Sequence, residues 1–178
     1  EFFDHLRTAP EFKFANKQAL LDGYNAIRAR VDANVPKLFS LTPKSPFEIR
    51  PVPEYSEKNE AAGSYRQGTP DGTRAGIFYV NTYDLPSRTT PRMETLFLHE
   101  AIPGHHFQIA LAQENESLPN FMRFDGNTAF AEGWALYAER LMGELGYLEN
   151  PDYYLGMLRA QAMRAVRVIV DIGMHLDR

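Results

Sequence analysis

The stretch LHEAIPGHHFQ, residues 98 to 108, interrupts a helical pattern that runs from Pro91 to Glu114. Pro103 cannot donate a hydrogen bond to the carbonyl of His99, and its ring clashes with the preceding turn. Gly104 tolerates the backbone angles that such a break requires. The sequence therefore predicts two helical segments over residues 91–114 that are interrupted at Pro103 and Gly104.

Two histidines follow this break, and helix geometry limits which of them can lie beside His99. In a regular helix His105 would lie ~240° around the axis from His99, whereas His106 would lie ~20° away but ~10.5 Å further along. Neither position suits a shared metal ion, because Zn–N bonds measure only about 2.0–2.1 Å. If the turn bulges by two extra residues, His105 takes the place of an ordinary i+4 ligand. We predict His99 and His105 as metal ligands, with His106 as the alternative second ligand.

Glu132 is the predicted third ligand, because it interrupts the small and apolar stretch AFAEGWAL. A carboxylate buried there must be paired or must bind a metal ion, since burying it alone is costly; otherwise it is a solvated glutamate. Glu100 follows the first ligand, where a glutamate can hold and deprotonate a metal-bound water. Glu139 lies two turns after Glu132 on the same helix face and could orient a ligand histidine.

The rest of the chain predicts an α+β fold that is mainly helical, with a small antiparallel sheet beside the metal-binding helix. Residues 16–39 have the spacing of an amphipathic helix that ends near Pro36. Residues 47–85 hold three candidate strands: FEIRPVPEY, whose prolines suit an edge, AAGSYRQG and RAGIFYVNTYDL. Residues 91–178 supply the helices of the metal site, with predicted caps at Asn127 or Thr128 and at Asn150 and a stop at Gly146.

Composition restricts the classes of function. The chain of 178 residues fits a single domain, and it has no cysteine, which excludes disulfides and thiolate metal sites. A net charge of −4 gives no basic surface for nucleic acid, and no run of 18 apolar residues predicts a membrane span. The start without Met and the end inside a helical pattern lead us to expect a fragment of a longer chain. Nothing in the sequence indicates the oligomeric state.

Three blocks, HEAIPGHHFQ, AEGWALYAE and RAVRVIVDIGMH, resemble the bacterial domain of unknown function 885. The resemblance runs from about residue 47 to the end, and that family looks like a distant relative of the gluzincin, or thermolysin-like, metallopeptidases. It implies a gluzincin-like catalytic core fragment in which His99, one of the two following histidines and Glu132 hold Zn²⁺ and Glu100 is the base. It also implies a peptide substrate and favours the cell envelope or periplasm.

The resemblance adds two expectations. In gluzincins an edge strand beside the zinc helix pairs with the substrate backbone, and GIFYVNTY would take that role unless it is a plain core strand. Related peptidases also place a His, Tyr or Arg opposite the metal to stabilise the oxyanion. On the last helix Arg167 and His175 are our candidates for this role, together with Arg164; otherwise the arginines belong to a salt-bridged surface and His175 to a helix end.

The leading interpretation is zinc-dependent hydrolysis of a peptide or related amide bond, and the alternative is a catalytically inactive metal- or peptide-binding module. A serine hydrolase is disfavoured, because the chain has no G-x-S-x-G motif. We further expect the 178-residue chain by itself to bind metal but to hydrolyse peptides poorly, since a gluzincin cleft is normally walled from two sides.

Overall fold

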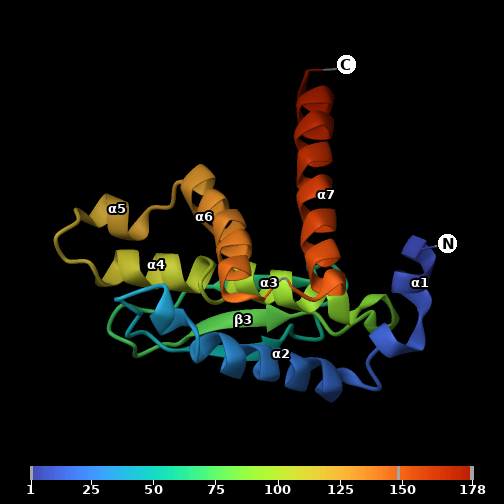
Figure 1. Cartoon of the computed structure of the whole chain (residues 1–178). Coiled ribbons are helices and arrows are strands. Elements are labelled where there is room, and N and C mark those ends of the chain that lie inside the picture. The colour runs from blue at the N-terminus through green and yellow to red at the C-terminus, as the bar shows by residue number, and fades with distance from the viewer. Residues whose placement is uncertain (1, 148, 177–178) are drawn as a thin grey trace.

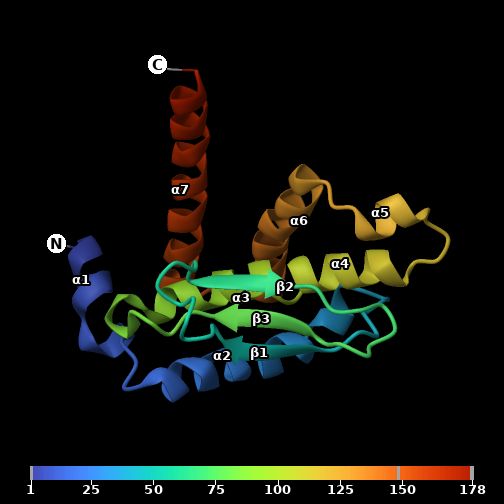
Figure 2. The same cartoon turned by 180° about the vertical axis from the view of Figure 1, so that it is seen from behind.

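The protein is described by a computed structural model that covers residues 2–147 and 149–176. Helices α2, α3 and α4 lie along one face of a three-stranded sheet, while α6 and α7 rise away from it (Figure 1). Figure 2, seen from behind, places the sheet in front of these helices. The predicted α+β fold with a helical majority is confirmed.

The sheet is mixed rather than wholly antiparallel, which corrects one part of the prediction. Its strands are β1 (Phe47–Pro51), β2 (Gly63–Arg66) and β3 (Gly76–Val80), in the order β1-β3-β2. Strand β3 pairs antiparallel with β2 but parallel with β1. The chain reverses direction between β1 and β2 and again between β2 and β3, so β3 runs parallel to β1 although it lies between the other two strands.

The strand that we expected to offer a free edge is the central one. Both sides of β3 are paired, and its alternate residues Phe78 and Val80 are buried, so GIFYVNTY is a core strand. The free edge nearest to α3 and α4 belongs to β2, which contacts both helices. The resemblance to gluzincins suggested the edge role for GIFYVNTY, and the structure supports the alternative of a core strand.

Helix α2 (Lys17–Asp32) covers the sheet, as its spacing predicts. The Asn16 side chain caps it by accepting a hydrogen bond from the backbone of Ala19. Its apolar positions recur at helical intervals and are buried: Leu20, Tyr24, Ile27 and Val31. A 3₁₀ turn over Val35–Lys37 follows, so the helix ends before Pro36.

The core lies between the sheet and α3 (Met93–Glu100). Phe97 of α3 is fully buried and contacts Phe47 of β1 and Phe78 of β3 at ring-centroid distances of 6.3 and 6.0 Å. Burying an aromatic side chain of this size contributes about 1.5–3 kcal/mol. This packing fixes α3, and therefore His99, relative to the sheet.

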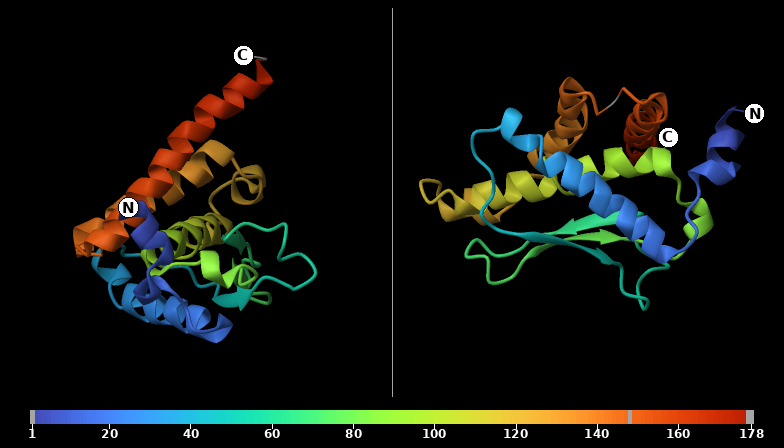
Figure 3. Two further views of the ribbon diagram at one scale, coloured as in Figure 1. Left: turned by 90° about the vertical axis from the view of Figure 1, so that its right-hand side faces the viewer. Right: turned by 60° about the horizontal axis from the view of Figure 1, so that its bottom comes forward.

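The remaining helices are α1 (Phe2–Thr8), α4 (His105–Glu114), α5 (Asn120–Phe124), α6 (Thr128–Leu141) and α7 (Pro151–His175). Asn127 caps α6, Asn150 caps α7, and Gly146 has a left-handed backbone after the 3₁₀ turn that follows α6, as predicted. The far half of α7 projects from the molecule (Figure 3). No helix in residues 2–147 and 149–176 is long and apolar enough to span a membrane.

Candidate metal centre

The break between α3 and α4 has the predicted form. Helix α3 ends at Glu100 and α4 begins at His105. Across the break the backbone N–H of Phe107 donates to the carbonyl of Ala101, a span of six residues where a regular helix spans four. The turn therefore contains the two extra residues that bring His105 into line with His99.

Gly104 makes this wide turn sterically feasible. A β-carbon placed on Gly104 would overlap the carbonyl oxygens of Leu98 and His99. Next to it, the carbonyl of Pro103 accepts a hydrogen bond of 2.7 Å from the indole Nε1 of Trp134 on α6. Two contacts therefore stabilise the break: the close approach of Gly104 to the backbone of α3, and the hydrogen bond from Trp134 of α6 to Pro103.

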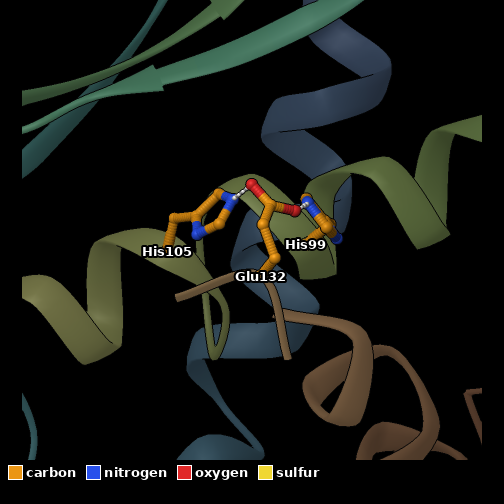
Figure 4. A group of neighbouring side chains, drawn as sticks. All are labelled: His99, His105 and Glu132. Carbon is orange, nitrogen blue, oxygen red and sulfur yellow. Dashed lines mark ion pairs between the residues drawn. The ribbon is translucent and has the colours of Figure 1, made fainter. Parts of the chain in front are cut away.

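His99, His105 and Glu132 meet at one point (Figure 4). Nε2 of His99 lies 3.4 Å from Oε2 of Glu132, and Nε2 of His105 lies 3.5 Å from Oε1. One ligand atom from each residue lies within 4.8 Å of the others. Ligands of a tetrahedral zinc ion are about 3.4 Å apart, so the three groups could hold such an ion with little adjustment.

The His99 imidazole is held from both sides by α6. Its Nδ1 lies 2.8 Å from Oε1 of Glu139, while Nε2 faces Glu132. A carboxylate can only accept, so Nδ1–H donates to Glu139, and neutral His99 then has a bare lone pair on Nε2. That lone pair and the Glu132 carboxylate are two acceptors facing each other, an arrangement that a cation between them would stabilise.

Glu139 is the centre of a buried network that orients His99. It is 1% exposed, accepts a hydrogen bond of 2.6 Å from the hydroxyl of Thr95, and forms an ion pair of 3.0 Å with Arg164 of α7. Burial by itself would raise the pKa of Glu139, but hydrogen bonds from His99 and Thr95 and the charge of Arg164 lower it below its usual value. The carboxylate is therefore ionised and fixed.

Thr95 was missed by sequence reasoning, although a signal exists. It lies four residues before His99, hence one turn away on the same face of α3. A hydroxyl at that position, one turn before a predicted ligand histidine, would have pointed to a partner for the same carboxylate.

The two adjacent histidines have different environments. His105 lies 4.7 Å from His99 between ring centroids, and burial together with nearby His99 and Arg164 lowers its pKa, which keeps the imidazole neutral. His106 instead points into the core, where it contacts the Tyr65 hydroxyl at 2.9 Å and stacks against Phe47 at 4.7 Å. Burial lowers the pKa of His106 to about 4. The alternative ligand assignment to His106 is therefore wrong in this fold.

Glu100 lies at the end of α3, next to the ligand group. Burial raises its pKa above the usual value, and the charge of Glu132 adds to the rise. The charges of His99 and Arg164 and the backbone of Tyr65 on β2 oppose it. A carboxylate with a raised pKa beside a candidate metal site has the properties of a general base.

The structure does not bring Arg167 or His175 to the metal centre, which corrects both assignments. Arg167 is exposed. The side chain of His175 is 76% exposed and bonds to its own helix at Asp171. His175 lies ~16 Å along α7 from Arg164, which is the residue that reaches the site. Of the three residues of α7 that the sequence analysis named, only Arg164 lies beside the candidate metal centre.

The fold and this group of side chains define a helical α+β domain with a candidate histidine–carboxylate metal centre. The chain belongs to the family of bacterial proteins of unknown function DUF885, which matches residues 1–178. A crystal structure of "the putative lipoprotein from Colwellia psychrerythraea" is similar, with a TM-score of 0.91 and 35% sequence identity. The match covers 96% of this chain and 30% of that one. No curated protein matches the chain.

Proposed function

We propose that His99, His105 and Glu132 bind a zinc ion and that the protein hydrolyses peptide or related amide bonds. The observation that supports this most strongly is the meeting of two imidazole nitrogens with one carboxylate at 3.4 and 3.5 Å. Two histidines and a glutamate leave a fourth position for water or substrate, as in catalytic zinc sites of the gluzincin type. A bound zinc would polarise the substrate carbonyl and lower the pKa of its water.

Glu100 and Arg164 have complementary roles in this proposal. Glu100 would take a proton from the attacking water and pass it to the leaving amine. Arg164 supplies the positive charge closest to the group, since its guanidinium lies 3.2 Å from Nδ1 of His99. Because it pairs with Glu139 behind the His99 ring, it could help to hold that ring in place. None of the three residues of α7 that we considered for the oxyanion role, Arg164, Arg167 and His175, faces the metal ligands from the Nε2 side of His99.

Two surfaces beside the centre suit a peptide. The free edge of β2 lies next to α3 and α4 and could pair with an extended backbone. A cavity of about 1220 Å³ between α4, α5 and α6 extends from Gln108, one turn after His105, to Ala131, beside Glu132. Its walls are largely apolar and aromatic and include Phe39, Phe107, Phe130 and Trp134. We propose that it receives apolar side chains of the substrate.

The cellular location that we propose is the cell envelope. The solved relative is described as a putative lipoprotein, and lipoproteins are anchored to membranes. This chain spans only 30% of the length of that relative. We therefore propose, and do not infer from the relative, that a longer protein with this domain hydrolyses peptides.

Metal analysis and peptide cleavage test the proposal separately. Protein purified without chelator should contain one zinc per chain, and Glu132→Gln should lose it. Glu100→Gln should keep the zinc but lower the cleavage rate of fluorogenic peptides ~10²–10⁴-fold, the usual contribution of a general base. Zinc bound with no cleavage, both by this chain and by a longer protein that contains it, would favour the inactive binding module instead. A protein that binds no zinc at micromolar concentration would refute the proposed centre.

A further inference from the structure

A second pocket lies on the Glu139 side of His99 and carries an unusual concentration of positive charge. It has a volume of about 370 Å³ and lies between α2, α3, α7 and the loop before α3. Four arginines line it: Arg88, Arg92, Arg159 and Arg164. Among the described residues that line the pocket, Glu139 is the single carboxylate.

Glu139 has little capacity left to neutralise these arginines. Its Oε1 already accepts from Nδ1 of His99 and from Arg164, and its Oε2 accepts from Thr95. Arg164 nevertheless keeps one buried nitrogen, Nη1, without an acceptor in the described part of the chain, and Nε of Arg88 is in the same condition. Buried donors of charged groups are normally satisfied by protein, water or a ligand, so these two nitrogens are available to an acceptor from solution.

Arg92 adds a third positive charge to the same space. It lines the same pocket as Arg88 and Arg159. Although Arg92 is exposed overall, burial of part of its side chain lowers its pKa, and the positive charges of Arg159 and Arg88 act in the same direction. Arg159 already has a partner, so we do not count it among the donors of the pocket. Like charges gathered in a partly desolvated pocket repel one another, and an anion placed among them removes that repulsion.

We propose that this arginine pocket binds a small molecule bearing a carboxylate or phosphate group, with Arg88, Arg92 and Arg164 as its donors. The planar guanidinium matches both groups, because it offers two parallel N–H bonds to a pair of oxygens. A volume of 370 Å³ suits a small organic acid or phosphate ester. Buried Tyr24 also lines the pocket, and its hydroxyl would be a neutral donor to such a group.

This site is distinct from the zinc site but shares a wall with it. Arg164 and Glu139 line the pocket, and Glu139 also accepts a hydrogen bond from His99. The pocket anion would meet Arg164 on the side opposite to the metal ligands. Binding should therefore be measurable whether or not the protein contains metal, and failure of one proposal leaves the other intact.

Isothermal titration calorimetry on chelator-treated protein tests the pocket. Inorganic phosphate and succinate are the two probes, and sodium chloride at matched ionic strength is the reference for screening. We expect saturable binding of one equivalent of at least one probe, weakened tenfold or more in Arg88→Gln and in Arg92→Gln. Arg140→Gln, which removes the same charge from an exposed position on α6, should bind as the unmodified protein does.

The two probes separate the sources of the anion. Tighter phosphate binding would indicate a phosphate ester, and tighter succinate binding a carboxylic acid. Arg92→Lys keeps the charge but loses the planar fork, so its loss should be smaller than that of Arg92→Gln, and it guards against a folding defect. Absence of saturable binding for both probes, or binding that both glutamine variants leave within twofold, would overturn the site.

Discussion

The junction of α3 and α4 and the far half of α7 are both apolar in sequence, yet they have opposite surroundings. At the junction Phe97, Leu98 and Ala101 are completely buried, and the backbone of the wide turn packs against itself. On α7 the side chain of Ile169 is 73% exposed, and its apolar neighbours share this exposure. Apolar residues at helical spacing predict a helix in both places, but only the tertiary structure decides which one is buried.

The boundary between these two environments falls within α7 itself. At its base Gly156 packs so closely that a β-carbon there would overlap the carbonyl oxygen of Pro91, and Met157 is buried. Arg164, two turns later, still reaches Glu139 and His99. The group of α7 that lies beside the candidate metal centre is therefore on its packed half, whereas Arg167 and His175 lie further along the helix.

Gly104→Ala should give the largest effect, because it tests the packed region at its tightest point. The added β-carbon would overlap the carbonyl oxygens of Leu98 and His99, so the turn must open. We expect a loss of about 3 kcal/mol in the free energy of unfolding, at the upper end of single substitutions. Urea unfolding measures it, and zinc affinity should fall with it because His105 would move from His99.

Gly133→Ala is the matched control for this change. A β-carbon at Gly133, beside Glu132 on α6, would meet no atom within 4 Å. Alanine is favoured over glycine inside a helix, so this variant should gain about 0.5–1 kcal/mol. Equal stability of the two variants would show that the wide turn is not tightly packed in solution.

Local chemistry explains which features could be predicted from the sequence. Asn16, Asn127 and Asn150 act as helix caps through their own side chains, and Pro103 with Gly104 interrupts its helix wherever that helix lies. These properties depend on a few neighbouring residues. The choice of His105 followed from the same reasoning, since the size of the bulge fixes which histidine faces His99.

The errors concern partners that are distant in sequence. The parallel pairing of β1 with β3 depends on where the connection through β2 passes, which no strand encodes alone. The choice among residues of α7 depends on how far that helix remains in contact with α3. The sequence did predict Glu139 as a residue that could orient a ligand histidine, because seven residues bring it ~20° short of two full turns from Glu132. What the sequence did not indicate is that Arg164 would join it.

Glu139→Gln should have an intermediate effect, on metal affinity. The amide keeps one acceptor for Nδ1–H of His99 but loses the charge that Arg164 balances. Partners that orient a ligand histidine typically contribute 10–100-fold to metal affinity, and we expect a loss of about that size. Competition with a zinc-sensitive dye measures it, with Glu144→Gln, exposed just after α6, as the control. Unchanged affinity would mean that the network does not orient His99.

Ile169→Ala should give the smallest effect, and it tests the exposed region directly. A side chain that is 73% exposed loses few contacts on truncation, so the free energy of unfolding should change by less than about 0.5 kcal/mol. Hydrogen exchange should agree: amides of residues 166–175 should exchange through local opening, well before those of α3. A loss above about 1 kcal/mol, or slow exchange there, would contradict this contrast. Such a result would mean that another surface covers the apolar half of α7 in solution, since exposed apolar patches of this kind often mark contacts with other protein surfaces.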